Sequence, residues 1–119
     1  MPVATFRFDD ILAEAAPVPV AAPIGTPVSV VRSRSITSAQ GTSRAGAWEC
    51  SPGRWRRQVL QAEFCHFLEG EAIFTPDAGD PVRLRAGDTA YFPAGSTGVW
   101  DVIERSRKVF LIFDEGEEA

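Results

Sequence analysis

The chain has 119 residues, of which 45% are hydrophobic, so it fits one domain that can bury a core of its own. Its formal net charge is −4, and residues 114–119 carry four of the 16 acidic side chains, which leaves 12 acidic against 12 basic residues in the body. A neutral body excludes a basic nucleic-acid-binding surface, and we expect no nucleic-acid partner.

The first 27 residues are predicted to form a short helix and an extended arm. Asp9 and Asp10 provide an acidic N-cap for a helix through residues 11–16. Prolines at four later positions forbid a helix and favour an extended chain, namely Pro17, Pro19, Pro23 and Pro27.

Residues 28–113 carry the pattern of short strands separated by turns. The stretch 28–36 is rich in β-branched residues, 40–46 reads as a Gly/Ser/Thr loop, and 47–50 reads as a strand that ends in the turn 51–53. The further strands expected are 63–68, 72–75, 82–84, 89–92, 98–103 and 108–113. Such strands, with turns rather than helices between them, indicate an all-β sandwich or jelly roll. The acidic residues 114–119 are expected to be a solvated tail.

The sequence also indicates the cell compartment. Two cysteines, Cys50 and Cys65, are too few for a disulfide framework. The N-terminus lacks the basic start and apolar core of a signal peptide. No apolar run approaches the roughly 20 residues that span a bilayer. We therefore expect a reduced, cytoplasmic protein with no membrane partner.

Two spaced motifs narrow the fold. Glu63 is followed after six residues by Gly70, and Gly87 is followed after five by Pro93, Ala94 and Gly95. These runs resemble parts of the two cupin motifs. The segments Trp48-Glu49-Cys50-Ser51-Pro52-Gly53 and Phe64-Cys65-His66 resemble the cupins that are similar to (S)-ureidoglycine aminohydrolase. The resemblance implies a double-stranded β-helix, that is, a jelly-roll cupin barrel over residues 28–113.

The resemblance also implies an activity, the hydrolysis of a C–N bond in a small polar metabolite. The named enzyme of that branch is a larger protein with two barrels and manganese. Metal-dependent cupins place a His-x-His pair before the motif glutamate, but this stretch reads Arg56-Arg57-Gln58-Val59-Leu60, and the third ligand position is Gly98. The cofactor is therefore unknown. A divalent metal would need some mixture of Glu63, His66, Cys50, Cys65 and Glu49, and strand alternation places the weak candidates Glu63 and His66 on opposite faces.

Glu63 is the expected catalytic residue. Alternation places it on one face with Cys65 and Phe67, and a carboxyl group buried among aromatic rings would have a raised pKa and could serve as general acid or base. The alternative is a structural role in which Glu63 pairs with an arginine, such as Arg54. Arg54, Arg56 and Arg57 are assigned to a loop near the barrel mouth, where they could bind a carboxylate or phosphate or simply form a solvated basic loop.

A small-molecule ligand is the expected partner of the barrel interior. The residues expected to bind it are Trp48, Arg54, Trp55, Cys65, Tyr91 and Trp100. Trp100 could fill the space that a metal occupies elsewhere, and the two cysteines could be apolar fillers or a reactive pair. Whether His66 and Lys108, the sole lysine, face the interior is left open.

Two further functions stay open beside the enzyme. One is a binding module without catalysis, and the other is a structural protein with a filled barrel. Small cupins commonly dimerise through an N-terminal strand that joins the partner's sheet, and residues 28–36 suit this role. Val99 and Ile103, on the expected outer face, would be covered by such an interface. We therefore expect a homodimer.

Overall fold

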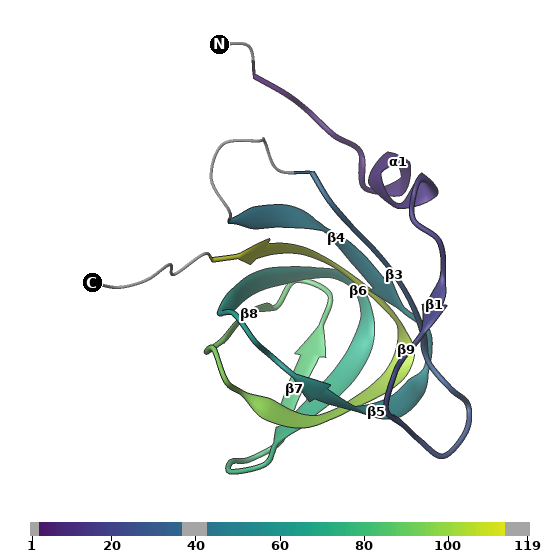
Figure 1. Ribbon diagram of the computed structural model, residues 1–119, viewed down its shortest axis with the longest axis vertical. Helices are drawn as coiled ribbons and strands as arrows, with labels where there is room; N and C mark the ends of the chain where they lie inside the picture. The colour runs from purple at the N-terminus through teal and green to yellow at the C-terminus, as the bar shows by residue number, and fades with distance from the viewer. Residues whose placement is uncertain (1–2, 37–42, 114–119) are drawn as a thin grey trace.

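The structure is a computed structural model that describes residues 3–36 and 43–113. These residues form a small barrel of antiparallel strands, with a short helix packed on the outside (Figure 1). The elements are α1 (Phe8–Ala13), β1 (Val18–Pro19), β2 (Pro23–Ile24), β3 (Val30–Ser35), β4 (Arg44–Cys50), β5 (Gly53–Gln58), β6 (Glu63–Pro76), β7 (Val82–Arg85), β8 (Thr89–Phe92) and β9 (Thr97–Ile112). The expected all-β architecture is confirmed.

Two long strands form the centre of the barrel. β6 and β9 run antiparallel from the Glu63–Ile112 pair to the Pro76–Gly98 pair, with bulges in between. β4 and β5 flank β9 along its two halves, while β7 and β8 pair with the two halves of β6. This pairing curls the sheet around a single interior, which holds the main hydrophobic core.

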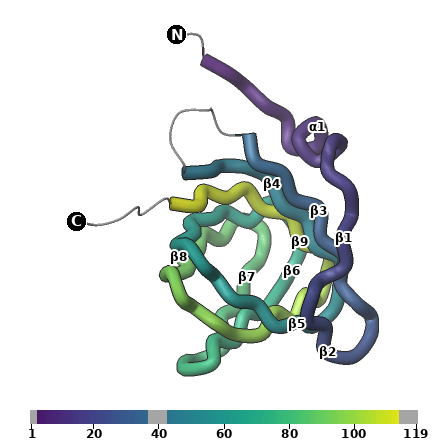
Figure 2. The backbone as a smooth tube through the Cα atoms, in the orientation of Figure 1, coloured from purple at the N-terminus to yellow at the C-terminus, as the bar shows by residue number. Residues whose placement is uncertain are grey.

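The proline-rich arm joins the two edges of the flanking sheet. That sheet runs in the order β1-β3-β4-β9-β5-β2, so two neighbouring pieces of the arm occupy its opposite edges. Val18 pairs with Val31 on β3, and Pro23 pairs with Trp55 on β5. The backbone tube shows the arm descending from α1 past β1 to β2, beside β5 (Figure 2). We call residues 18–24 the strap.

The helix differs from its expected position by a few residues. It begins at Phe8 after an extended Arg7, which makes no side-chain cap hydrogen bond, and Asp9 and Asp10 lie in the first turn, where acidic groups favour the helix dipole. It ends at Ala13 rather than at residue 16, since Pro17 disfavours helical backbone just before it. Ile11 and Leu12 pack on Ala47 of β4 and fix the helix to the sheet.

Four assignments of strands, loops and turns were wrong. The arginine-rich segment expected as a loop is the strand β5. Its residues alternate as in a strand, with Gly53, Trp55 and Arg57 facing inward and Arg54 and Arg56 facing outward. β4 begins at Arg44, inside the expected loop 40–46, whose first part lies outside the described residues. The expected turn at Gly70 and the gap at residues 104–107 are parts of the continuous strands β6 and β9.

The described residues contain no helix with the length and apolar character needed to cross a membrane. The expected acidic tail, residues 114–119, lies outside them.

Candidate functional site

The inner face of β6 carries Glu63, Cys65 and Phe67, as strand alternation predicts. Their exposed fractions are 2%, 1% and 0%. His66, on the outer face, lies 2.9 Å from Thr89 Oγ1 through its Nδ1. Lys108 pairs with Phe67 across the β6–β9 ladder and also faces inward, so the question left open for both residues is answered.

Three charged groups meet inside the barrel around one carboxylate. Lys108 Nζ lies 2.8 Å from Glu63 Oε2, and Arg57 Nη2 lies 2.7 Å from Glu63 Oε1. The side chains of Lys108 and Glu63 are 1% and 3% exposed, and that of Arg57 is 18% exposed. Two cations share one anion, so the cluster carries one excess positive charge when all three groups are ionised. We call these residues the interior triad.

Four aromatic rings enclose the Lys108 ammonium. Its Nζ lies 4.4 Å from the ring centroid of Trp48, and 5.6 to 5.7 Å from those of Phe67, Phe92 and Trp100. Ring faces attract a cation at such distances, most strongly where water is excluded. The ammonium has three N–H donors, and Glu63 Oε2 is its nearest charged acceptor. The rings therefore hold a cation that is only partly satisfied by hydrogen bonding.

Burial and charge act differently on the two members of the buried pair. Burial raises the pKa of Glu63, but the charges of Lys108 and Arg57 and their hydrogen bonds outweigh it and hold that pKa below its ordinary value. The expected raised pKa of Glu63 is therefore wrong, because the sequence did not show the two cations beside it. Burial lowers the pKa of Lys108, which shares its carboxylate with Arg57. Lys108 thus releases its proton more readily than a surface lysine.

A groove of about 490 Å³ on the surface reaches one member of the triad, Arg57. One side of it is formed by residues of β3, β4 and β5, and the other by the arm at residues 16–21. The strand residues that line it are Val31, Ser33, Trp48, Trp55, Arg56, Arg57 and Gln58. Two of them touch the triad directly, since Trp48 packs on the Lys108 ammonium and Arg57 is itself a member. The groove therefore offers a ligand aromatic walls and the Arg57 cation.

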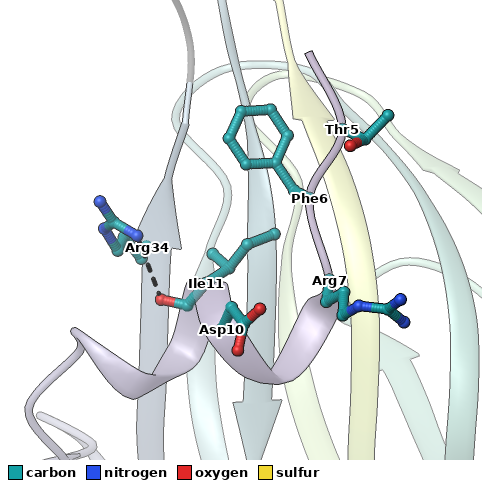
Figure 3. A pocket seen from close by; sticks show the side chains of 6 residues that line it. All are labelled: Thr5, Phe6, Arg7, Asp10, Ile11 and Arg34. Atoms are coloured by element: carbon teal, nitrogen blue, oxygen red, sulfur yellow. Dashed lines mark hydrogen bonds between the residues drawn. The ribbon is translucent and has the colours of Figure 1, made fainter.

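A second hollow, about 510 Å³ in volume, lies outside the barrel between the N-terminal segment and β3 (Figure 3). Here Arg34 Nη1 donates to the Ile11 carbonyl oxygen at 3.5 Å, while Arg7 and Asp10 point toward solvent. Apart from Ile11, its lining residues are exposed. It lacks the enclosed charges of the barrel groove, which we take as the site.

The donor set of the barrel does not fit a metal ion. Within residues 3–36 and 43–113, no three His, Cys, Asp or Glu side chains gather as a ligand group. The groups around Glu63 are the cations Arg57 and Lys108. Their positive charges would repel a metal ion bound to the same carboxylate. His66 points away from the interior.

Four of the six residues expected to bind a ligand face the interior. They are Trp48, Trp55, Cys65 and Trp100. Burial raises the pKa of the Cys65 thiol and also that of Cys50, so both behave as apolar fillers. Trp100 is fully buried and packs on Phe67, Phe74 and Phe92, where it fills the barrel.

Two expected residues lie away from the triad, and the sequence did not identify Arg57 and Lys108 as the partners of Glu63. Arg54 is exposed on the outer face of β5, so the arginine that pairs with Glu63 is Arg57. Tyr91 is 56% exposed on the outer side of β8. The sequence pattern that could have placed Arg57 on the inner face was its alternation with Trp55. For Lys108, it was the position between Arg107 and Val109, which face outward.

Comparisons with known proteins place the chain in a family. The model of the EutQ-like cupin domain matches residues 37–110. No curated protein matches significantly. A DUF861 family protein from Thermotoga maritima is 30% identical, with a TM-score of 0.55 over 56% of this chain and 76% of that one.

Two other solved structures share the fold. The EutQ protein of Clostridium difficile is 17% identical, with a TM-score of 0.64 over 71% of this chain and 63% of that one. A DUF861 family protein of unknown function from Pseudomonas syringae is 24% identical, with a TM-score of 0.73 over 87% and 46%. The chain thus spans less than two thirds of these two proteins. The all-β barrel is a cupin barrel, and since the family model covers more than half of the sequence, the chain belongs to the EutQ-like cupin domain family.

Proposed function

We propose that the barrel is a binding site for a small organic anion, of the carboxylate class, that enters through the groove. The observation that carries this proposal is the excess positive charge of the interior triad. A buried charge without a counter-charge is costly, because the low dielectric of the interior does not replace its hydration. An anion in the groove would balance the triad, so the charge favours anions over neutral molecules of similar shape.

Arg57 is the residue that would contact the anion. Its side chain lines the groove and is 18% exposed, whereas the other two members of the triad are sealed. A guanidinium has five N–H donors, and Glu63 Oε1 accepts from Nη2. Further donors of the fork can hold a carboxylate, the geometry that arginine matches best. Trp48 and Trp55 would form the apolar walls.

The state of Glu63 favours binding over the expected C–N hydrolysis. A general acid must hold a proton to donate, but the two cations keep Glu63 ionised. Ionised and paired on both oxygens, Glu63 instead positions Arg57 and Lys108. Loss of a small carboxylate's affinity in a Glu63 variant would therefore report on this positioning.

The test compares two arginines of one strand. Binding of acetate, glyoxylate, pyruvate and succinate is measured by tryptophan fluorescence, since Trp48 and Trp55 line the groove. We expect Arg57→Gln to weaken binding about tenfold or more, the effect of losing a charged hydrogen bond. Arg54→Gln, on the outer face of the same strand, should bind as the wild type does.

Two results would overturn the proposal. One is equal binding of each acid and its uncharged amide. The other is an Arg57→Gln variant that binds like the wild type. If Arg54→Gln loses binding instead, Arg54 is the residue that binds the anion, as the sequence led us to expect.

We also propose that the chain forms a homodimer through the outer face of the barrel. An uncharged row crosses four strands in register, from Ala45 to Leu111, Phe64 and Tyr91. Leu111, Phe64 and Tyr91 are 36%, 45% and 56% exposed. A second copy can pack on this row about a two-fold axis, because an uncharged patch meets itself without like-charge repulsion.

A further inference from the structure

Lys108 is the only lysine of the chain, and the other eleven cationic side chains are arginine. This one lysine is fully buried inside the barrel, whereas the arginines lie on outer faces, at edges or, for Arg56 and Arg57, at the groove. Arginine keeps its proton in proteins, but a buried lysine can lose it and become a nucleophilic amine. The chain therefore places its single side-chain amine against Trp48 and beside the carboxylate that Arg57 binds, and Trp48 and Arg57 both line the groove.

The spacing of the triad indicates which ligand could reach this amine. Arg57 and Lys108 bind the two oxygens of the same carboxylate, at 2.7 and 2.8 Å, so their nitrogens lie only a few atoms apart. A carboxylate held by Arg57 would bring an adjacent carbonyl carbon toward Lys108 Nζ. A small 2-oxo acid has these two groups on neighbouring carbons.

We propose that Lys108 forms an imine with the carbonyl group of a small 2-oxo acid. The inference rests on the proposed anion site, since Arg57 would hold the carboxylate of the same molecule. Glu63 would accept a proton from the ammonium, and the aromatic rings would hold Nζ in place as positioning groups.

The reaction balances without a further reagent. The ammonium passes one proton to Glu63 Oε2, 2.8 Å away, and the neutral amine attacks the carbonyl carbon. A C–N bond forms as the C–O π pair moves to oxygen, which takes up a proton from the attacking nitrogen. The resulting carbinolamine takes back the proton held by Glu63 Oε2 and loses its oxygen as water, while its nitrogen lone pair completes a C=N bond. Ammonium and carbonyl thus give a protonated imine and one water, with no change in total charge.

The surroundings of Nζ favour both the free amine that starts this reaction and the protonated imine that it forms. Burial lowers the pKa of Lys108, which increases the fraction of free amine. The protonated imine is again a cation, so it keeps the attraction of Glu63 and of the Trp48, Phe67, Phe92 and Trp100 rings. An enclosed site also slows hydrolysis of the product by excluding water.

The test is reductive trapping. The whole protein is incubated with pyruvate or glyoxylate and cyanoborohydride, and the intact mass is measured. We expect close to one carboxyethyl or carboxymethyl group per chain, placed on Lys108 by peptide mapping. The N-terminal amine is the other primary amine, and mapping separates it from Lys108.

Two variants provide controls. Lys108→Arg keeps the charge but has no nucleophilic amine, so the internal adduct should be absent. Arg57→Gln should trap pyruvate about tenfold more slowly, because the carboxylate anchor is lost, and should lose less of its rate toward uncharged propionaldehyde.

The outcomes separate the two proposals. Binding of pyruvate by fluorescence without an adduct on Lys108 would overturn the imine and leave the anion site standing. An adduct confined to the N-terminal amine would do the same. Absence of both binding and adduct would overturn both proposals. If Lys108→Arg does not fold, peptide mapping of the wild-type protein still decides between Lys108 and the N-terminus.

Discussion

At the scale of single residues, Glu63 has two cationic partners and Lys108 has one carboxylate. Removing Glu63 leaves Lys108 and Arg57 together in the barrel without a counter-charge, whereas removing Lys108 leaves Glu63 paired with Arg57. Breaking a buried pair from one side typically costs about 3–5 kcal/mol, because the remaining charge is left without a partner. Removing Glu63 should therefore destabilise the folded protein more than removing Lys108 does.

We predict that Glu63→Gln lowers the free energy of unfolding by about 3 kcal/mol or more, and Lys108→Met by less than half of that. The Met side chain is close to Lys in length and suits the aromatic enclosure. Urea unfolding followed by tryptophan fluorescence measures both values. The double variant should be more stable than Glu63→Gln alone, because it removes one of the two uncompensated cations. Equal losses in the two single variants would show that Arg57 does not hold Glu63.

The acid side of the stability profile should depend on Glu63. Its pKa in the folded protein lies below the ordinary value of 4.5, which the unfolded chain has. The stabilisation is therefore complete above pH 4.5 and is lost as the pH falls through the folded-state pKa, because the unfolded chain binds the proton first. Urea midpoints from about pH 7 to 3 should fall steeply in the wild type and less steeply in Glu63→Gln.

A matched acidic variant provides the control for this pH dependence. Glu49 also has a lowered pKa, since its hydrogen bonds and ion pairs with Arg32 and Arg107 outweigh its burial. Glu49→Gln should flatten part of the same acid limb. A Glu63→Gln profile parallel to that of the wild type would mean that Glu63 is not ionised in the folded protein.

Prediction from the sequence succeeded at Glu63 and failed at its partners for one reason. Strand alternation fixes which residues of a known strand share a face, and so it placed Glu63, Cys65 and Phe67 correctly. It does not fix which strands are neighbours. Arg57 and Lys108 reach Glu63 from β5 and β9, and β5 was not recognised as a strand.

At the scale of elements, β6 turns through a bulge at Gly70 instead of ending there. The register shifts between Phe67 and Glu69 and again at Glu71, and Gly70 has φ +93°. A Cβ at this position would lie 2.2 Å from the Arg105 carbonyl oxygen of β9. The glycine thus allows both an unusual backbone angle and a close approach of two strands.

Gly87 offers a matched control for Gly70. Its φ is +95°, but no atom lies within 4 Å of the place where a Cβ would be. We predict that Gly87→Ala costs about 1 kcal/mol for backbone strain alone, and that Gly70→Ala costs at least twice as much, because β9 must also move. Urea unfolding of the two variants measures the difference. Equal losses would show that the strand contact at Gly70 relaxes freely.

The same bulge explains why sequence reasoning divided the long strands. Glycine and charged residues at 69–71 are typical of a turn, and residues 104–107 are polar, so β6 and β9 were each expected as shorter pieces. In a curled sheet a strand can bend at a bulge and continue, and its outer residues are charged because they face solvent. β8, which is short and pairs with β6 without a register shift, was predicted at its observed bounds.

At the scale of the whole molecule, the barrel has two surfaces that a second copy could bind: the β3 edge beside the strap, and the uncharged row on the outer face. The strap pairs with Val30 and Val31 of β3 and leaves the rest of that edge, Arg32–Ser35, without a second strand among the described residues. The β3 edge corresponds to the dimer interface expected from the sequence, in which the N-terminal strand at residues 28–36 joins the partner's sheet. The uncharged row through Phe64 presents the exposed side chains of Leu111, Phe64 and Tyr91, and we place the second copy there.

Two outer-face residues of equal exposure distinguish these interfaces. Phe64 on β6 and Ile103 on β9 are both 45% exposed, so a charge at either position should disturb the monomer fold to a similar, small degree. We predict that the wild-type protein sediments as a dimer, that Phe64→Glu sediments as a monomer, and that Ile103→Glu stays dimeric. Analytical ultracentrifugation over a hundredfold range of concentration measures all three. A like-charge pair created at a two-fold contact opposes association, which is the physical reason for the Phe64→Glu result. Dissociation caused by Ile103→Glu alone would move the interface to the region of Val99 and Ile103, and a wild-type monomer at every concentration would reject the homodimer.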